Sequence, residues 1–164
     1  MEIRIRKIKS DDIDWIKNVF NQRWGGDFII TRGKIHKPEA LDGFAAEADG
    51  EKFGLITFKI TGKEMELVSL DSFLEKKGIG TTLVNEVINL AKGQKLERVW
   101  GITTNDNLNA LKFWQNRGLY LTKIYPNALE ASRKLKPGIP LIGENGIPLK
   151  DEIELEIRLK NFLK

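Results

Sequence analysis

The most informative segment of the chain is Asp71-Ser72-Phe73-Leu74-Glu75-Lys76-Lys77-Gly78-Ile79-Gly80-Thr81-Thr82. Residues 64–71 predict a strand, and Leu83, Val87 and Leu90 recur at the spacing of a helix over residues 79–91. Glycines in such a loop let the backbone approach a ligand, and the unpaired N–H groups of the helix's first turn attract an anion. Two interpretations follow: a plain strand-to-helix turn, or a loop that binds phosphate or pyrophosphate.

Two common phosphate-binding motifs do not match this loop. No Gly-Lys-Ser/Thr sequence closes it, so it is not the P-loop of nucleotide hydrolases. It lacks the third glycine of the dinucleotide fingerprint, and it lies in mid-chain after predicted antiparallel strands rather than in an opening βαβ unit. Lys76 and Lys77 nevertheless add positive charge at the same end of the predicted helix.

The segments on either side of this loop predict further helices and strands. Residues 28–30 fit either a strand or a packed loop. The other predicted elements are a helix over 11–23, strands over 44–49 and 53–60, a strand over 98–104, a helix over 107–116, a strand over 119–125, a surface connection over 136–149, and a strictly alternating strand over 153–159. This order predicts an α/β fold in which one mixed sheet has helices on both faces.

Length and composition predict one domain over residues 1–164. The chain has 164 residues, of which 41% are hydrophobic and 30% charged, enough to bury a sizeable core. The net charge is +4 with both signs interleaved, so a pI near 9.2 does not predict a nucleic-acid surface, although it is compatible with a cleft for an anionic small molecule. Without cysteine, and with His36 as the single histidine, disulfides, thiolate chemistry and a His-rich metal centre are excluded, and we expect no metal.

The location of the protein is predicted from its hydropathy. Residues 1–6 alternate charged and apolar side chains and lack the apolar run of a signal peptide. No uninterrupted apolar stretch is long enough to span a bilayer. We therefore expect a soluble, cytoplasmic protein with no membrane partner.

A second segment, downstream of the glycine loop, carries a family resemblance. It reads Ile102-Thr103-Thr104-Asn105-Asp106-Asn107-Leu108-Asn109-Ala110-Leu111-Lys112-Phe113-Trp114-Gln115-Asn116-Arg117-Gly118-Leu119. Its N-x-x-A-x-x-F-W-x-x-x-G-L pattern, together with the loop pattern x-x-G-x-G, resembles the GNAT superfamily of acetyl-CoA-dependent N-acetyltransferases. The Thr-Thr-Asn-Asp-Asn run and the closing Gly146–Glu156 segment resemble a prokaryotic stand-alone branch of that superfamily.

The resemblance implies a fold and a cofactor site. The fold is a mostly antiparallel twisted sheet of about six to seven strands with helices on both faces. The acetyl-CoA pyrophosphate lies on the glycine loop, the pantetheine arm pairs with the strand end, and polar and aromatic residues of the second segment line the arm. The implied cofactor-binding residues are Val68, Ser69, Leu70, Glu75, Lys76, Lys77, Gly78, Ile79, Gly80, Thr81, Asn105, Asn107, Asn109, Phe113 and Trp114.

The chain departs from the family pattern at three positions. Glu75 replaces the Gln or Arg that usually opens the loop, and we expect this carboxylate to face away from the anion or to pair with a lysine. Trp114 replaces the usual tyrosine, and its indole N–H has no acidic proton to give. Leu119 replaces the usual phenylalanine, a tolerable change of a core side chain.

The resemblance also implies direct attack of an amine on the thioester. A backbone N–H near Leu70 stabilises the oxyanion. Glu64 and Glu66 share one face of a strand and are the candidate bases, with Glu66 nearer the thioester, although two solvated carboxylates would produce the same pattern. His36 is the other titratable candidate, against an ordinary loop histidine. Tyr120, Tyr125 or water protonates the leaving thiolate in place of Trp114.

The acceptor is the least specified part of the sequence. The implied acceptor region contains Trp24, Arg32, His36 and Tyr125, although for Trp24 the sequence favours fastening a helix end to the sheet. The acidic residues of the final strand either attract a cationic amine or form the wet face of an edge strand.

The sequence is compatible with two functions of different kinds. The first is N-acetyl transfer to a primary amine, by a monomer or by a homodimer paired through the final strand. The second is a catalytically silent acyl-CoA-binding module, suggested by Trp114 and Glu75. A nucleic-acid binder would need a basic stripe with interleaved aromatic residues, which the sequence lacks.

Overall fold

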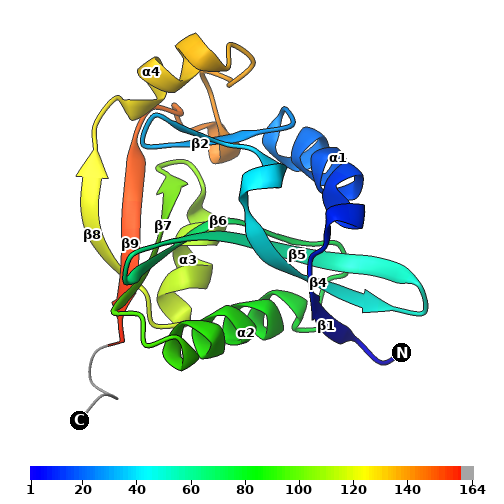
Figure 1. The fold of residues 1–164 in the computed structure, drawn as a ribbon. Coiled ribbons are helices and arrows are strands. Elements are labelled where there is room, and N and C mark those ends of the chain that lie inside the picture. The colour runs from blue at the N-terminus through cyan, green and yellow to red at the C-terminus, as the bar shows by residue number, and fades with distance from the viewer. Residues whose placement is uncertain (160–164) are drawn as a thin grey trace.

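The structure is a computed structural model that describes residues 1–159 (Figure 1). Its helices are α1 (Ile13–Trp24), α2 (Ile79–Gly93), α3 (Leu108–Asn116) and α4 (Ala128–Leu135). Its strands are β1 (Arg4–Lys7), β2 (Ile29–Thr31), β3 (Lys34–His36), β4 (Asp42–Ala48), β5 (Glu51–Thr61), β6 (Glu64–Ser72), β7 (Arg98–Thr104), β8 (Tyr120–Tyr125) and β9 (Glu152–Arg158). None of the helices in this part of the chain has the length and apolar character needed to cross a membrane.

Seven strands form one sheet in the order β1-β4-β5-β6-β7-β9-β8. Every neighbouring pair is antiparallel except β6 and β7, which are parallel. The fold class predicted from the sequence, a mixed and mostly antiparallel α/β sheet, is therefore confirmed. Residues 28–30, left open between strand and loop, contribute to the separate hairpin of β2 and β3.

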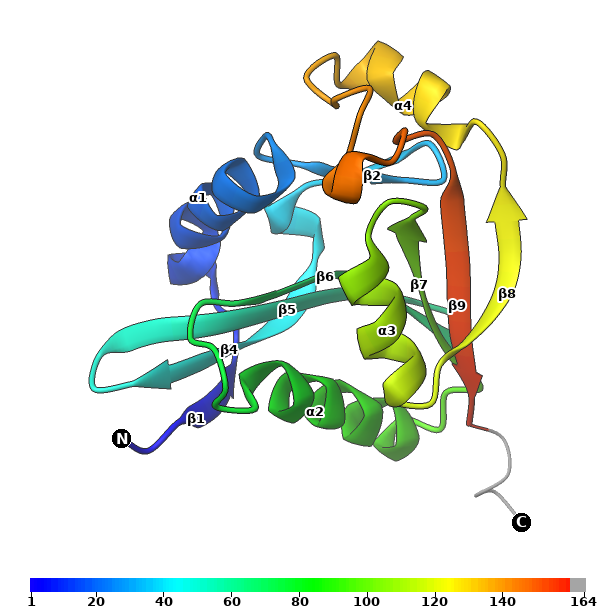
Figure 2. The ribbon, with the colours of Figure 1, turned by 180° about the vertical axis from the view of Figure 1, so that it is seen from behind.

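The sheet divides between β6 and β7. These strands pair only from Glu64–Leu67 to Arg98–Gly101, and beyond Leu67 the β6 backbone has no strand partner on the β7 side among residues 1–159. In Figures 1 and 2 the strands β7, β9 and β8 run at a steep angle to β4, β5 and β6. The division thus leaves the C-terminal half of β6 open along one edge.

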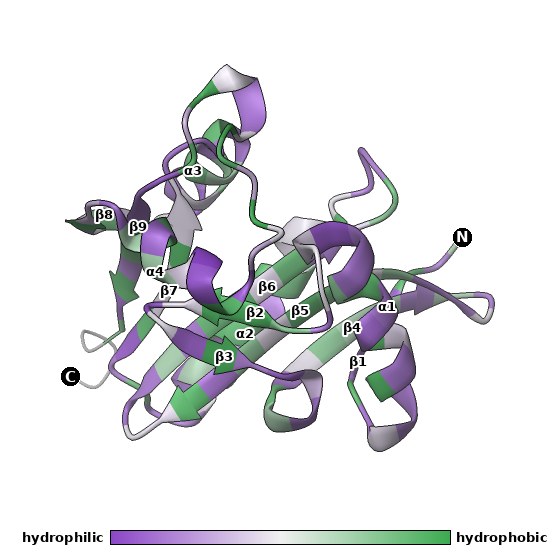
Figure 3. Ribbon diagram, turned by 90° about the horizontal axis from the view of Figure 1, so that it is seen from above, coloured by the Kyte–Doolittle hydropathy of each residue, from purple (hydrophilic) through white to green (hydrophobic). Residues whose placement is uncertain are grey.

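Two buried clusters hold the helices to opposite faces of the sheet. Ile79, Leu83 and Val87 of α2 pack against apolar side chains of β4, β5 and β6, as their helical spacing predicts. On the other face, Ile16, Val19 and Phe20 of α1 pack with Leu55 and Val68. Figure 3 shows the β2–β3 hairpin lying across the central strands on the α1 side.

A β-bulge in β6 changes which side chains share a face. Thr57 pairs with Ser69 but Phe58 pairs with Leu67, so Val68 is an extra residue on β6. Without the bulge, Glu66 and Asp71 would point to opposite faces, because side chains alternate along a strand. With it, Glu66 contacts β2 and Asp71 contacts the end of α1, so both carboxylates lie on the same face.

The final strand does not lie at an edge, which corrects one expectation. β9 lies between β7 and β8, and β8 forms the edge of the described sheet. Glu152, Glu154 and Glu156 are therefore 2%, 4% and 6% exposed rather than a wet face. Because both sides of β9 are paired within the protein, β9 has no free edge for the homodimer pairing considered above.

Candidate functional site

The N-terminus of α2 forms an anion site from backbone groups. Gly78 is its N-cap and has φ +68°, a left-handed conformation that glycine adopts without strain. Thr82 N–H is the first to bond back, to the Gly78 carbonyl at 2.9 Å. The N–H groups of Ile79, Gly80 and Thr81 precede that bond, and no side chain in the described part of the protein caps this end of the helix. They are free to bind a phosphate.

Arg117, which follows α3, adds a positive charge to this anion site. Its guanidinium donates to Thr81 Oγ1 from Nε at 3.1 Å and from the second terminal nitrogen at 2.5 Å. It lies 3.5 Å from the Phe113 ring centroid, and burial lowers the pKa of Arg117. Sequence inspection missed this residue, because Arg117 falls on an unspecified position of the second segment's pattern and nothing local shows that it contacts Thr81.

A cleft of about 500 Å³ begins beside this anion site and follows the open edge of β6. We name it the split-sheet cleft. The backbone of Gly80 lies close to Phe113 in this cleft, and a Cβ added at Gly80 would be 3.4 Å from the Phe113 ring. The predicted cofactor residues that line the cleft are Val68, Ser69, Leu70, Gly80, Asn107, Asn109, Phe113 and Trp114.

Several predicted cofactor residues lie elsewhere. The Asn105 amide is held by the segment before β9, donating to the Pro148 carbonyl and accepting from two backbone N–H groups, which directs it away from the cleft. The Ile79 side chain is in the core, so only its backbone serves the anion site. Glu75, Lys76 and Lys77 are exposed on the loop before α2 and do not line the cleft.

The Asn107 side chain, which does line the split-sheet cleft, also has a structural task. Its Oδ1 accepts from Ala110 N–H at 3.1 Å and caps α3. Its amide N–H groups are left for a ligand. Phe113 and Trp114 lie edge to face, 5.0 Å apart, on the same helix.

A second cavity of about 510 Å³ adjoins the split-sheet cleft, and we name it the hairpin cavity. Trp24, Thr103 and Asn107 line both, so the two spaces meet at the end of α1. Apolar residues make most of its wall, and its buried polar residues include Thr31, Lys136 and Glu152. Lys136 donates to the carbonyls of Trp24 and Phe28, at 2.5 and 2.7 Å.

The other residues predicted for the acceptor region lie behind the wall of the hairpin cavity. The Arg32 guanidinium lies 3.3 Å from the centroid of the Tyr125 ring and also bonds Glu152 at 3.3 Å. Arg32, Tyr125 and His36 do not line the hairpin cavity themselves. They instead support Glu152 and Thr31, which do.

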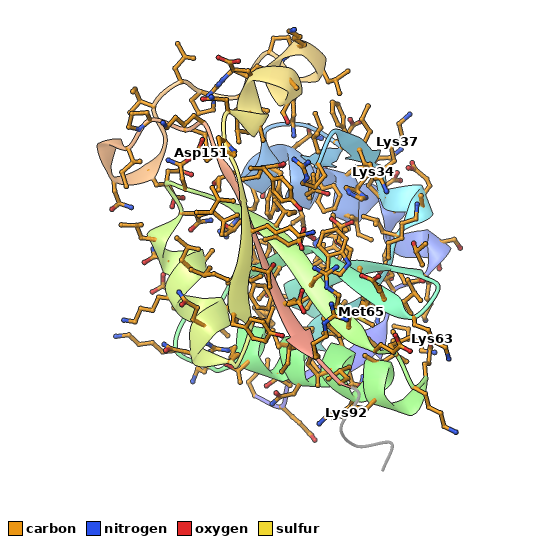
Figure 4. All side chains as sticks on the ribbon, turned by 90° about the vertical axis from the view of Figure 1, so that its left-hand side faces the viewer. Lys34, Lys37, Lys63, Met65, Lys92 and Asp151 are labelled. Atoms are coloured by element: carbon orange, nitrogen blue, oxygen red, sulfur yellow. The ribbon has the colours of Figure 1, made fainter. Side chains whose placement is uncertain are left out.

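Glu66 is a buried carboxylate that forms no ion pair with a lysine or arginine within the described residues. It is 8% exposed, and its Oε2 accepts from Thr31 Oγ1 at 2.6 Å. His36 Nε2 lies 2.7 Å from Thr31 Oγ1 and 3.7 Å from Glu66 Oε2. Burial raises the pKa of Glu66, and the Thr31 hydrogen bond and Lys34, labelled in Figure 4, oppose that rise. Burial lowers the pKa of His36 to about 4, which leaves the imidazole neutral at pH 7.

Glu64 has a different environment, although it lies only two residues away. Its side chain is 50% exposed and accepts from Arg98 at 2.7 Å. Arg98 also pairs with Glu154 and Glu156, so one guanidinium holds three carboxylates. The Tyr120 hydroxyl donates to Glu156 at 3.3 Å and lies outside both cavities. The structure therefore does not bring Tyr120 or Glu64 to the cleft.

Asp71 is a buried carboxylate that sequence inspection did not single out. It is 8% exposed, lines the split-sheet cleft, and accepts from the Trp24 indole N–H at 3.0 Å. Burial raises the pKa of Asp71, and the Trp24 hydrogen bond opposes that rise. No group of three or more acidic, His or Cys residues in the described chain is arranged to hold a metal ion.

A divided, mostly antiparallel sheet whose opening meets a helix N-terminal anion site is the architecture of an acyltransferase of the GNAT type. The model of the acetyltransferase (GNAT) family matches residues 10–119 of this chain. The chain belongs to that family.

Relatives and solved structures agree with this assignment. The chain is 45% identical over 139 residues to the protein YdhI of Bacillus subtilis (strain 168), covering 84% of this chain and 87% of YdhI. The fold is similar to that of an IAA acetyltransferase from Bacillus cereus ATCC 14579, with TM-score 0.70 and 20% identity over 96% of this chain and all of that one (100%). A Bacillus subtilis acetyltransferase in complex with CoA gives TM-score 0.69 and 22% identity over 96% of this chain and 99% of that chain.

Proposed function

We propose that the protein transfers the acetyl group of acetyl-CoA to a primary amine. The observation that carries the proposal is the continuity of three features: the anion site of α2, the split-sheet cleft, and the hairpin cavity beside Glu66. The cofactor extends from the first along the second, and the acceptor amine enters from the third. A fold neighbour has been solved in complex with CoA, which supports the choice of donor.

The cofactor binds through backbone and a few side chains. Its diphosphate lies on the N–H groups of Ile79–Thr81 with Arg117 beside them, and its pantetheine arm follows the unpaired edge of β6 past Asn107. The thioester then lies near Leu70, whose backbone N–H stabilises the oxyanion. Preorganised donors of this kind contribute about 3 kcal/mol in other acyl transfers.

A base is required because alkyl amines are protonated in water. With a pKa of about 10.4, only about one amine in 2,500 is neutral at pH 7. We assign the base to Glu66 rather than Glu64, because Glu66 is buried with no lysine or arginine partner among the residues described, whereas Glu64 is paired with Arg98. A carboxylate with a raised pKa is a better acceptor of that proton.

The thiolate of CoA leaves without an obvious acid. Trp114 lines the cleft where the family usually has a tyrosine, and the hydroxyls of Tyr120 and Tyr125 are directed to Glu156 and Glu154. Water, or the proton released by the amine nitrogen, therefore neutralises the thiolate. A thiol pKa of about 8.5 makes this feasible near neutral pH.

The proposal is tested first by ligand-dependent unfolding. CoA and acetyl-CoA, at about a hundredfold over a micromolar dissociation constant, should stabilise the protein by about 2–3 kcal/mol, and ATP should not. A panel of primary amines is then assayed by release of free thiol. Stabilisation without thiol release on any amine contradicts the proposed transfer.

A catalytically silent acyl-CoA-binding module is the second candidate, and Trp114 is the observation that favours it. Such a module would bind both CoA species equally well and release no thiol. Replacing Trp114 with tyrosine separates the two candidates, since activity that appears only in W114Y identifies the natural protein as silent.

We further propose that residues 1–164 act as one domain in the cytoplasm, without a metal, as a monomer or homodimer. Light scattering in the presence and absence of acetyl-CoA tests the assembly state. Retention of activity in EDTA tests the metal.

A further inference from the structure

Thr31 stands between the candidate base and the space where an acceptor would lie. Glu66 and His36 do not line the hairpin cavity, whereas Thr31 does. All three side chains are buried, and Thr31 Oγ1 is within hydrogen-bond distance of both of the others, 2.6 Å from Glu66 Oε2 and 2.7 Å from His36 Nε2. Thr31 therefore lies between the hairpin cavity and Glu66.

The direction of these hydrogen bonds follows from proton counting. An ionised Glu66 only accepts, so the single hydroxyl proton of Thr31 is donated to it. The bond between Thr31 and His36 then needs a proton from the imidazole, which places it on Nε2. The hydroxyl oxygen has two lone pairs, and His36 uses one of them. The other remains for an N–H of the acceptor.

We propose that the Thr31 hydroxyl carries the proton of the acceptor amine to Glu66, an inference that rests on the proposed acetyl transfer. The ammonium R–NH₃⁺ gives a proton to Thr31 Oγ1 while Thr31 gives its own proton to Glu66 Oε2, so R–NH₂ and a neutral Glu66 result and Thr31 is unchanged. The amine then attacks the thioester carbon and the C–S bond breaks. The second nitrogen proton neutralises the CoA thiolate, and Glu66 releases its proton to solvent before the next turnover.

In this scheme Thr31 is a catalytic residue and His36 is a positioning residue. The Nε2–H of His36 fixes the hydroxyl so that its proton is directed to Glu66. The charged groups that act on Glu66 and His36 are Lys34 of β3, Lys59 of β5, and Glu152 and Glu154 of β9. Of these, Glu152 also lines the hairpin cavity, which makes it the competing base.

The relay is tested by a matched pair of variants at one position. T31V keeps the branched shape and removes the hydroxyl, whereas T31S keeps the hydroxyl. With an amine that the wild-type protein acetylates, we expect T31V to lower kcat/KM by about 10²-fold, the lower end of a general-base contribution, and T31S to stay within about threefold. Because both residues act on one proton, T31V/E66Q should be no slower than E66Q alone. T31A repeats the comparison if T31V does not fold.

Imidazole NMR gives a second readout that needs no turnover. His36 is the single histidine of the sequence, so its ¹⁵N signals require no assignment. At pH 7 we expect a neutral ring protonated on Nε2 in the wild type, and a changed tautomer in T31V. Identical His36 signals in both proteins contradict the hydrogen-bond chain.

The kinetic outcomes distinguish a failure of the Thr31 relay from a failure of the proposed acetyl transfer. A T31V variant as active as the wild type, beside an inactive E66Q, overturns the relay and leaves acetyl transfer standing. An inactive E152Q beside an active E66Q overturns both the relay and the role of Glu66. A wild-type protein that binds acetyl-CoA and acetylates no amine overturns the proposed function, and the relay with it.

Discussion

The two cavities that meet at Trp24 are built from different kinds of atoms. In the split-sheet cleft, the groups that suit a ligand are largely backbone: the first turn of α2 and the unpaired edge of β6. In the hairpin cavity and behind it, the polar groups are buried side chains, among them Thr31, Glu66 and Glu152. Under the proposed function, the fixed backbone holds a cofactor that never varies, whereas side chains select the acceptor.

This difference predicts different sensitivities to substitution. Most side-chain substitutions leave backbone N–H groups in place, so single substitutions in the split-sheet cleft should weaken cofactor binding rather than abolish it. On the hairpin side, Glu66 is a buried carboxylate without a lysine or arginine partner in the described structure, and its one side-chain hydrogen bond comes from Thr31. A change of one polar atom there should have a large effect.

The largest expected effect is at Glu66. Glu66→Gln should lower kcat/KM by about 10²- to 10⁴-fold, because the amide cannot take the proton of the amine. The dissociation constant for acetyl-CoA should change by less than about twofold. Glu64→Gln is the matched control, and we expect a loss below about threefold because its carboxylate is half exposed and bound to Arg98. Steady-state kinetics and calorimetry measure both; equal losses in the two variants would remove the distinction between the glutamates.

The next largest effect is expected at the anion site beside the cleft, at Arg117. Arg117→Ala should weaken CoA binding by about 10- to 100-fold, the range for a hydrogen bond to a charged group. Lys112→Ala removes the same charge from an exposed position of α3 and should change affinity little. Calorimetric titration with CoA compares them. If both lose affinity equally, the contribution is long-range charge rather than contact.

The same contrast explains how much the sequence could predict. The residues of the cleft come from two short segments, 71–82 and 102–119, whose glycine and asparagine spacing is visible in the chain. Eight of the predicted cofactor residues accordingly line the cleft. Asn105 was misplaced because its contacts are to residues 148–151, and nothing local indicates that the segment before β9 folds back onto it.

The hairpin side could not be predicted in this way. Asp71 lies on the same face as Glu66 because of the bulge at Val68. Regular alternation of side chains along the strand would place it on the opposite face. The acidic residues of β9 looked solvated because alternation alone does not reveal that β8 covers the edge. The face of Asp71 and the covered edge of β9 both depend on register and strand order, which long-range contacts decide.

The third prediction concerns the pH dependence of the free energy of unfolding, and it follows from His36 on the hairpin side. Burial lowers the pKa of His36 to about 4, against about 6.5 in an unfolded chain. Between these values the unfolded state holds a proton that the folded state lacks, so folding stability falls as pH falls. Relative to His36→Gln, the wild type should lose about 2 kcal/mol from pH 7 to pH 4.5. Urea unfolding at both pH values measures this, and a constant difference would show that His36 titrates normally.

The smallest effect is expected where the two cavities meet. Trp24→Phe keeps the apolar ring and removes the indole N–H that donates to Asp71 at 3.0 Å. Losing that bond should lower the free energy of unfolding by about 1–2 kcal/mol at pH 8, where the Asp71 carboxylate is ionised. Burial already raises the pKa of Asp71 in the folded state, and the lost bond raises it further. The cost should therefore shrink as pH falls and the carboxyl becomes protonated, because a neutral carboxyl accepts a weaker hydrogen bond from the indole.

Asp71→Asn supplies the control for this last experiment. In the asparagine background the charge is absent, so Trp24→Phe should have a smaller effect that no longer depends on pH. A full double-mutant cycle by urea unfolding at pH 8 and pH 4.5 isolates the pair. If Trp24→Phe instead has the same cost at both pH values and in both backgrounds, its effect comes from packing at the end of α1. In that case the boundary between the two cavities is held by shape, and Asp71 is independent of it.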